Sequence, residues 1–170
     1  DARRLNDSLK PDGGASDNAK LLYGNTTIEL KGPKDIFVDG LNHLYIVNTE
    51  SNQIIVTDEE FNVRLIISEF TNKFGVPDSL KAPSGVFVNA DEIFVADTGN
   101  SRIVVFDKLG NFVDIVPEPA SEVLPDNSVY QPVAVAVDKA GRIYVVSSTT
   151  NYGVISLNRD GSFNGFIGPQ

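Results

Sequence analysis

Four oxygen-bearing side chains recur at matching places along the sequence, and they are the first candidates for chemistry. They are Asp39, Asn48, Asp97 and Asp138. An Asp or Asn at the end of a strand can accept backbone N–H bonds and so fix the turn that follows. The same kind of oxygen, gathered around one axis, would also suit a Ca²⁺ ion. Because the positions recur, a structural role is favoured; calcium is the one cofactor left open, and no other is expected.

Two further residues, His43 and Arg102, have side chains suited to catalysis or ion pairing. His43 is the only histidine. It lies between two short apolar segments, where we expect an exposed turn residue rather than a metal ligand or a general base. A Ser-His-Asp triad would need His43, but no Gly-x-Ser-x-Gly motif accompanies it. Arg102 closely follows Asp97, and we expect it to tie one turn to its neighbour through a salt bridge.

Four aromatic residues fall outside the strand-like segments and are the candidate binding residues. They are Phe70, Phe74, Tyr130 and Tyr152. Aromatic side chains in loops can form a surface that binds a protein or a sugar. They can equally fill the seams between neighbouring sheets, and the sequence leaves both alternatives open.

Composition excludes several classes of function. The chain has 23 acidic against 14 basic residues and a formal net charge of −9, so nucleic-acid binding is not expected. Without any cysteine, it can form neither disulfides nor thiolate metal sites. No run approaches the ~20 apolar residues that span a bilayer, so we expect no membrane insertion by this segment. The first residue is Asp1 and Met is absent, which we interpret as part of a longer or processed chain.

The strongest signal is an internal repeat with a period of about 50 residues, visible in segments 33–49, 83–98 and 132–148. Each copy continues into further short apolar segments rich in Val, Ile, Phe and Tyr, separated by Gly, Asn and Asp. In the second copy we expect strands at about 85–89, 92–97, 102–107 and 111–116. Four-stranded units at this period are typical of β-propeller blades.

The sequence therefore predicts an all-β fold, a β-propeller section of three four-stranded antiparallel blades. The blades are expected at about 33–67, 83–116 and 132–167, within a domain at 21–170 that follows a polar linker at 1–20. Residues 26–30 could be the outer strand of a preceding or closing blade, and 68–82 and 117–131 are expected as long connections, the second of them an exposed loop.

Three blades do not close a propeller, because closed rings have roughly four to eight. We therefore expect this section to be part of a six-bladed ring. The remaining blades would come from the same parent chain, which we favour, from a second copy, or from another protein. An open half-ring would leave apolar blade faces in water.

The second copy resembles the NHL repeat. The residues that carry the resemblance are Pro83, Gly85, Val88, Ile93, Phe94, Val95, Ala96, Asp97, Thr98, Asn100, Arg102, Ile103, Phe106, Gly110 and Phe112. The first copy departs with Asn48 and Gln53, and the third lacks the Asp-Thr-x-Asn-x-Arg stretch. The resemblance covers residues 33–168. Segments 137–147 and 161–168 also look like the extracytoplasmic NHL regions of large bacterial membrane proteins of the Yip type.

What the resemblance implies is a non-catalytic binding or scaffold module whose loops face a protein or glycan partner, at an extracytoplasmic, secreted or cell-surface location. The alternative is an enzyme, a metal-dependent lactonase or hydrolase of the six-bladed propeller type, with Ca²⁺ or Zn²⁺ in the axial channel. Histidine-rich lyases on related propellers need several histidines, and this chain has one. A non-enzymatic role is favoured.

Overall fold

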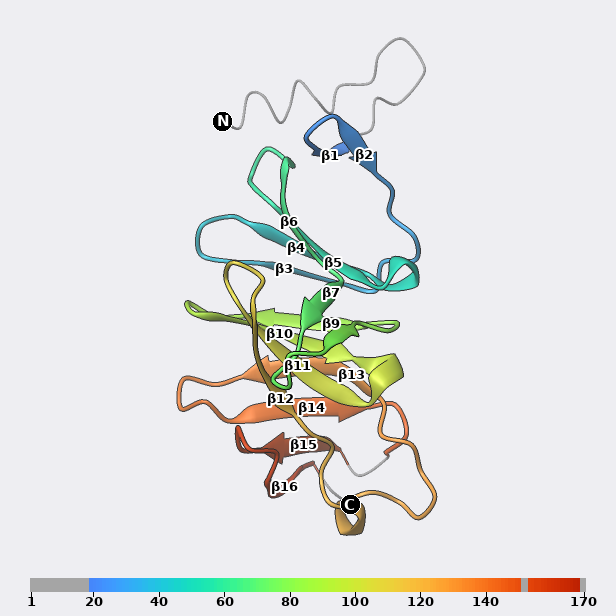
Figure 1. Cartoon of the computed structure of the whole chain (residues 1–170). Helices are drawn as coiled ribbons and strands as arrows, with labels where there is room; N and C mark the ends of the chain where they lie inside the picture. Colours follow the sequence, from blue (N-terminus) through green and yellow to red (C-terminus); the bar gives the residue numbers. More distant parts are fainter. Residues whose placement is uncertain (1–18, 151–152, 169–170) are drawn as a thin grey trace, which may run out of the picture.

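Three four-stranded antiparallel sheets stack face to face in chain order (Figure 1). The computed structural model describes residues 19–150 and 153–168. The first sheet contains β3 (Asp35–Val38), β4 (Leu44–Asn48), β5 (Gln53–Thr57) and β6 (Val63–Ile67). The second contains β9 (Gly85–Val88), β10 (Glu92–Asp97), β11 (Arg102–Asp107) and β12 (Phe112–Val116). The third contains β13 (Pro132–Val137), β14 (Ile143–Ser147), β15 (Val154–Leu157) and β16 (Phe163–Ile167). The prediction of an all-β fold with four-stranded antiparallel units is confirmed.

The middle sheet explains why its strands are apolar at nearly every position. A sheet that is covered on both faces needs apolar side chains on both sides of each strand. Along β10, Ile93 and Val95 point into the cluster shared with the first sheet. Phe94 and Ala96 point into the cluster shared with the third sheet. All four are buried.

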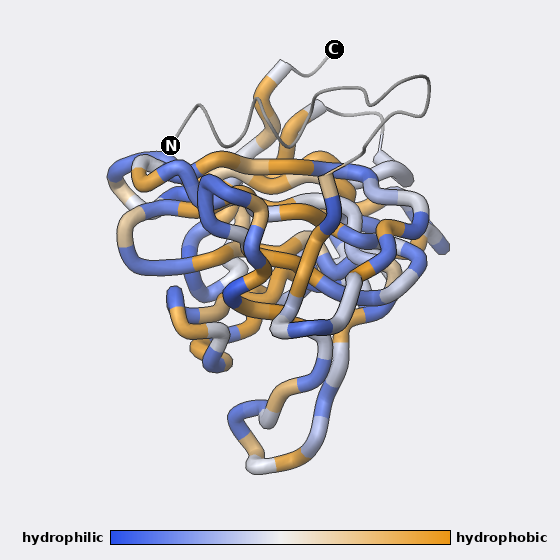
Figure 2. The backbone as a smooth tube through the Cα atoms, turned by 90° about the horizontal axis from the view of Figure 1, so that it is seen from above, coloured by the Kyte–Doolittle hydropathy of each residue, from blue (hydrophilic) through white to orange (hydrophobic). Residues whose placement is uncertain are grey.

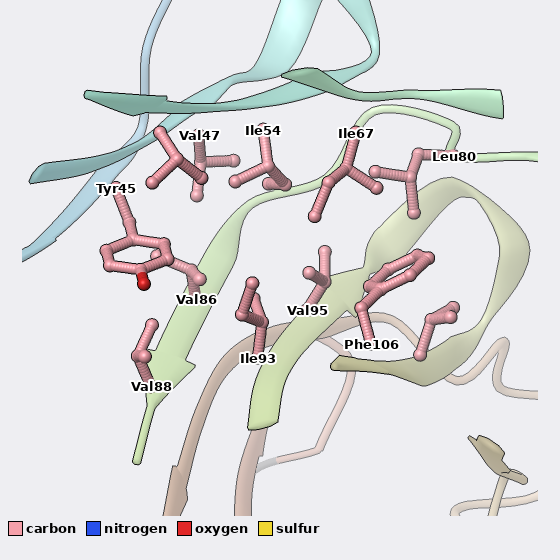
Figure 3. Packing of buried hydrophobic residues seen from close by; sticks show 12 residues of the cluster. Tyr45, Val47, Ile54, Ile67, Leu80, Val86, Val88, Ile93, Val95 and Phe106 are labelled. Atoms are coloured by element: carbon pink, nitrogen blue, oxygen red, sulfur yellow. The ribbon is translucent and has the colours of Figure 1, made fainter. Parts of the chain in front are cut away.

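The interface between the first two sheets is an interdigitated apolar layer (Figure 3). The first sheet contributes Tyr45, Val47, Ile54, Val56 and Ile67, and the second contributes Val86, Val88, Ile93, Val95, Val104 and Phe106. Hydrophobic residues gather in the middle of the stack, and hydrophilic residues lie mainly around its edges (Figure 2). Burial of these branched side chains is the main force that holds the sheets together.

Within each sheet, neighbouring strands are joined by tight turns with a repeated chemistry. Gly110, Gly141 and Gly161 occupy the same position within their respective turns, with φ of +85°, +86° and +86°. Glycine reaches this left-handed region at little cost.

Two smaller hairpins accompany the three sheets. β1 (Leu21–Tyr23) and β2 (Thr26–Ile28) pair with each other, and Leu22 bridges to Asn62 next to β6. β7 (Glu69–Thr71) and β8 (Pro77–Ser79) form the second hairpin. Segment 68–82 does connect the first sheet to the second, as expected, and the hairpin within it is a feature that the sequence did not predict. The hairpin forms because the side chain of Asn72 accepts two backbone N–H bonds in the turn.

Three short 3₁₀ helices complete the described residues: η1 (Thr49–Ser51), η2 (Thr98–Asn100) and η3 (Ser121–Val123). The first two link the central strands of their sheets, and the third lies in the connection at 117–131. In the described part of the chain, no helix has the length and apolar character needed to cross a membrane.

Candidate functional site

The recurrent position at the end of each second strand anchors the chain segment that enters the sheet. Its side chain accepts a backbone N–H from a residue that lies just before the first strand. The pairs are Asn48 with Lys31 at 2.7 Å, Asp97 with Lys81 at 2.7 Å, and Ser147 with Gln131 at 3.1 Å. The third copy thus keeps the contact with a hydroxyl, although the NHL-like motif is lost there. These side chains serve the fold, each in its own sheet.

Arg102 makes the salt bridge expected of it and reaches a second carboxylate as well. Its Nε donates to Asp97 at 2.8 Å, and its two terminal nitrogens donate to Asp78 at 2.9 and 3.0 Å. These hydrogen bonds from Arg102 lower the pKa of Asp78 to about 2. The Asp97 side chain is fully buried. Arg102 therefore connects the β7–β8 hairpin to the second sheet.

Asp39 and Asp138 each fix the turn between the first two strands of their sheets. Asp39 accepts the N–H groups of Leu41 and His43, both at 2.9 Å. Burial would raise the pKa of Asp39, but these bonds and the hydroxyl of Tyr45 outweigh it and lower the pKa. This geometry fits a structural role for Asp39 in its turn, the first of the two alternatives given for the recurrent oxygen-bearing side chains.

At Asp138, the Tyr144 hydroxyl donates at 2.8 Å and lowers the pKa to about 2, aided by hydrogen bonds from Arg142. Within residues 19–150 and 153–168, no group of three or more His, Cys, Asp or Glu side chains is placed to hold a metal ion.

His43 lies in the turn between β3 and β4, at the position expected. Its Nδ1 is 3.2 Å from an Asp39 oxygen, and 37% of its side chain is exposed. The imidazole faces a cleft that the sequence did not reveal, so His43 is one part of a larger surface.

That cleft, of about 580 Å³, lies between the first and second sheets at the end of the strands where their turns cluster. It is lined by Leu41, His43, Tyr45, Val56, Arg64, Leu65, Ala90, Lys108 and Leu109. A neighbouring hollow of about 530 Å³ shares Leu41, Ala90 and Lys108 with it. Together they form a continuous surface, which we call the turn cleft.

The turn cleft combines apolar side chains with basic ones. Leu41 and Leu109 are 74% and 78% exposed, an unusual state for leucine. Lys108 bridges the two sheets, since its Nζ is 3.5 Å from Asp39 and 5.4 Å from the centre of the Tyr45 ring. Arg64 is paired with Asp58 at 2.7 Å. The sequence does contain one sign of this site, since Leu41 and Leu109 are each an apolar residue inside an otherwise polar turn.

The candidate aromatic residues separate into two groups. Phe70 packs in the seam, with its ring centre 5.1 Å from that of Phe106 and 5.5 Å from that of Phe112. Tyr130 is buried between the second and third sheets. Both therefore fill seams between sheets, and the prediction that they are surface binding residues is wrong. Phe74 is exposed at the tip of the β7–β8 hairpin, whereas Tyr152 lies outside the described residues.

Comparison with known proteins agrees with this architecture. Residues 80–106 match the NHL repeat family model. A protein of Bacteroides fragilis described as exported superposes with a TM-score of 0.65 at 12% identity, over 89% of this chain and 41% of that one. Hydrazine synthase of Kuenenia stuttgartiensis superposes with a TM-score of 0.60 at 12% identity, over 86% and 39%. Virginiamycin B lyase of Staphylococcus aureus gives 0.51 at 12% identity, over 84% and 45%. No curated protein matches the sequence.

The fold is therefore of the β-propeller type, and it carries an NHL repeat at residues 80–106. At 12% identity these likenesses establish the fold alone. The chain spans about 40% of the length of the first two structures.

Proposed function

We propose that this protein is a non-catalytic binding module, and that its turn cleft binds a protein or glycan partner. The observation that carries the proposal is the exposure of Leu41 and Leu109 beside a cleft of about 580 Å³. Binding sites are typically concave and largely apolar, with a few polar groups that fix orientation. Function on such scaffolds resides in loops that a rigid sheet framework holds in place.

The polar rim of the cleft defines the chemistry of the partner. His43, Arg64 and Lys108 offer N–H donors around an apolar floor, in a chain whose net charge is −9. A partner with hydroxyl or carboxylate acceptors next to an apolar patch would match this arrangement. Both a peptide loop and an oligosaccharide have this character.

We further propose an extracytoplasmic location, within a larger membrane protein of the Yip type. Two structural neighbours support the location. One is the exported B. fragilis protein. The other is the extracellular domain of a two-component-system protein from B. thetaiotaomicron, with a TM-score of 0.50 at 15% identity, over 74% of this chain and 17% of that one.

The test is an NMR titration of the ¹⁵N-labelled chain with a panel of neutral and acidic oligosaccharides and synthetic acidic peptides. We expect at least one probe to shift backbone signals around Leu41, Leu65 and Leu109. The variant Leu109→Glu should abolish those shifts. The control Val129→Glu alters an exposed residue outside the cleft and should preserve them. Shifts confined to other regions, or none with any probe, would refute the proposal.

A further inference from the structure

The β7–β8 hairpin is held firmly in the seam between the first two sheets (Figure 1). Phe70 packs against the apolar cluster that these sheets share, with the rings of Phe106 and Phe112 as its neighbours. Arg102 fastens Asp78 through two hydrogen bonds of 2.9 and 3.0 Å. A further sheet stacked before the first or after the third would lie on an outer face of the stack, so it would not cover this seam.

The register of the hairpin fixes which of its backbone groups point outward. Asn72 donates its N–H to the carbonyl of Val76 at 3.0 Å, and Leu80 donates to the carbonyl of Ser68 at 2.9 Å. In an antiparallel pair, hydrogen-bonded positions alternate with positions whose N–H and C=O point away from the partner strand. The outward positions are Glu69 and Thr71 in β7, and Pro77 and Ser79 in β8.

The outer edge of β8 is closed to another strand. Pro77 has no N–H to donate. The Ser79 N–H donates to an oxygen of Asp78 at 2.7 Å. The Ser79 carbonyl accepts hydrogen bonds from Asn100 at 3.0 Å and from Arg102 at 3.1 Å. Natural sheets block their edges in such ways, because an unpaired edge invites a further strand.

The carboxylate that closes the β8 edge has counterparts on edge strands of the larger sheets. Asp35 of β3 accepts the N–H of Ile36 at 2.9 Å, and Asp114 of β12 accepts the N–H of Ile115 at 2.8 Å. Both β3 and β12 lie at the edge of their sheet. In each case an aspartate occupies the N–H of the next residue, which an added strand would otherwise use.

The outer edge of β7 lacks this protection. The residues before its outward positions are Ser68 and Phe70, and neither has a carboxylate. Glu69 and Thr71 are both exposed. In the described part of the chain, their N–H and C=O groups have no hydrogen-bond partner. A firmly held hairpin therefore offers donors and acceptors in a row along one open edge.

We propose that β7 binds an extended peptide segment of a protein partner, which adds to the hairpin as a third strand beside Glu69 and Thr71. An extended polypeptide backbone has acceptors and donors at the spacing of a strand, and strand addition to an open edge is a recurring mode of peptide recognition. The residues that line the turn cleft do not belong to this hairpin. The inference therefore stands independently of the proposed binding function.

Exposed side chains near this edge define the peptide further. Glu69 would face a basic residue of the added strand, because opposite charges directly across a ladder attract each other. Toward the turn, Phe74 and Val76 are 76% and 51% exposed, and the Lys73 Nζ lies 5.1 Å from the centre of the Phe74 ring. The peptide should therefore carry a basic residue at the end near Glu69 and an apolar residue at the end near Phe74.

The experiment is an NMR titration of the ¹⁵N-labelled chain with acetylated and amidated peptides of about seven residues, a typical strand length. In these peptides Val alternates with Thr, and one Lys is moved from position to position. We expect at least one peptide to shift the amide signals of Glu69 and Thr71 and to slow their hydrogen exchange, because both N–H groups become bonded. Shifts confined to Leu41 and Leu109 would overturn this inference and leave the proposed function standing. Unchanged β7 signals with every peptide would also overturn it.

Two variants of one residue separate backbone pairing from side-chain contact. Thr71→Pro removes an outward N–H and should raise the dissociation constant of the bound peptide about tenfold or more. Thr71→Ala keeps that N–H and should leave the dissociation constant nearly unchanged. The hairpin should tolerate the proline, since this N–H has no partner in the fold and Pro77 already occupies the facing position. Equal affinities of the two variants would contradict strand addition.

A modified peptide gives the same test without altering the protein. The peptide that binds is made again with N-methyl groups on the residues that pair with Glu69 and Thr71, which removes its own donors. We expect this peptide to lose binding to the unaltered chain. Binding that persists would mean that the contact does not use the backbone, and the proposal would be wrong.

A charge exchange tests the register of the added strand. Glu69→Lys should weaken binding of the lysine-bearing peptide several-fold, and a peptide with Glu in place of that Lys should regain the affinity. The control Glu122→Lys makes the same change at an exposed residue of the connection at 117–131 and should leave both affinities unchanged. If the control weakens binding as much as Glu69→Lys does, net charge alone attracts the peptide, and its pairing with β7 is refuted.

Discussion

Arg102 and Asp78 face each other through two parallel hydrogen bonds, of 2.9 Å from Nη1 to Oδ2 and 3.0 Å from Nη2 to Oδ1. The Nε of the same guanidinium donates to the buried carboxylate of Asp97 at 2.8 Å. A planar guanidinium with fixed donors suits such a double contact, and lysine could not reproduce it. One side chain thereby fastens the β7–β8 hairpin to the second sheet.

Loss of this guanidinium should be costly. Arg102→Ala leaves Asp97 buried without its charged partner, and removing one partner of a buried pair typically costs about 3–5 kcal/mol. We expect the free energy of unfolding, measured by urea denaturation, to fall by about that amount. Arg64→Ala is the matched control, because the Arg64 side chain is 67% exposed in its ion pair with Asp58, and its loss should cost less than about 1 kcal/mol. Equal losses in the two variants would contradict this role.

Acid should destabilise the protein in a defined window. The pKa of Asp78 and of Asp138 is lowered from 3.8 to about 2 in the folded chain. A carboxylate with a lowered pKa stabilises the fold above its unfolded pKa, and that contribution is lost as the pH falls through the folded value. The urea midpoint should therefore drop between about pH 4 and pH 2. Asp78→Asn should flatten this slope, and an unchanged slope would count against the Arg102–Asp78 link.

The second and third sheets lie close together at Gly85. A Cβ added there would lie 2.8 Å from the carbonyl oxygen of Val133 and 3.1 Å from the Cα of Ala134. Since backbone cannot move aside as a side chain can, Gly85→Ala should destabilise the protein by about 1–3 kcal/mol. Gly40→Ala is the control, because nothing lies within 4 Å of its added Cβ. A thermal melt that separates the two variants by less than a degree would disprove the close approach.

The hydroxyl of Tyr130 is buried without a hydrogen-bond partner among the described residues. An unsatisfied buried hydroxyl costs about 1–3 kcal/mol. Tyr130→Phe keeps the ring in the seam and should therefore raise the free energy of unfolding, whereas Tyr130→Ala should lower it by about 3–5 kcal/mol. Chemical denaturation of both variants tests this. A destabilised phenylalanine variant would mean that the hydroxyl has a partner.

Calcium should have no effect on the melting temperature. Asp39 and Asp138 use their oxygens in their own turns, which leaves few oxygens for a shared ion. A bound ion stabilises the folded state by mass action, so a melt in millimolar Ca²⁺ against EDTA is a direct test. A rise of several degrees would revive the lactonase or hydrolase alternative.

The sequence by itself determined the repeat and the elements within it. Apolar β-branched runs separated by glycine-containing turns specify short strands, because both signals act between residues close in the chain. The strands of the second copy, β9 to β12, agree with their expected ranges to within one residue. The turn role of Asp39 follows in the same way, since its partners Leu41 and His43 are at most four residues away.

Only the tertiary structure decided which of these elements face each other. Phe70 and Phe74 look alike in sequence, yet one packs against Phe106 and the other is exposed. Arg102 meets Asp78 across 24 positions, and the turn cleft is assembled from turns of two different sheets. Such neighbours depend on how the sheets stack. Stacking is set by the summed burial of whole faces, which no short stretch of sequence contains.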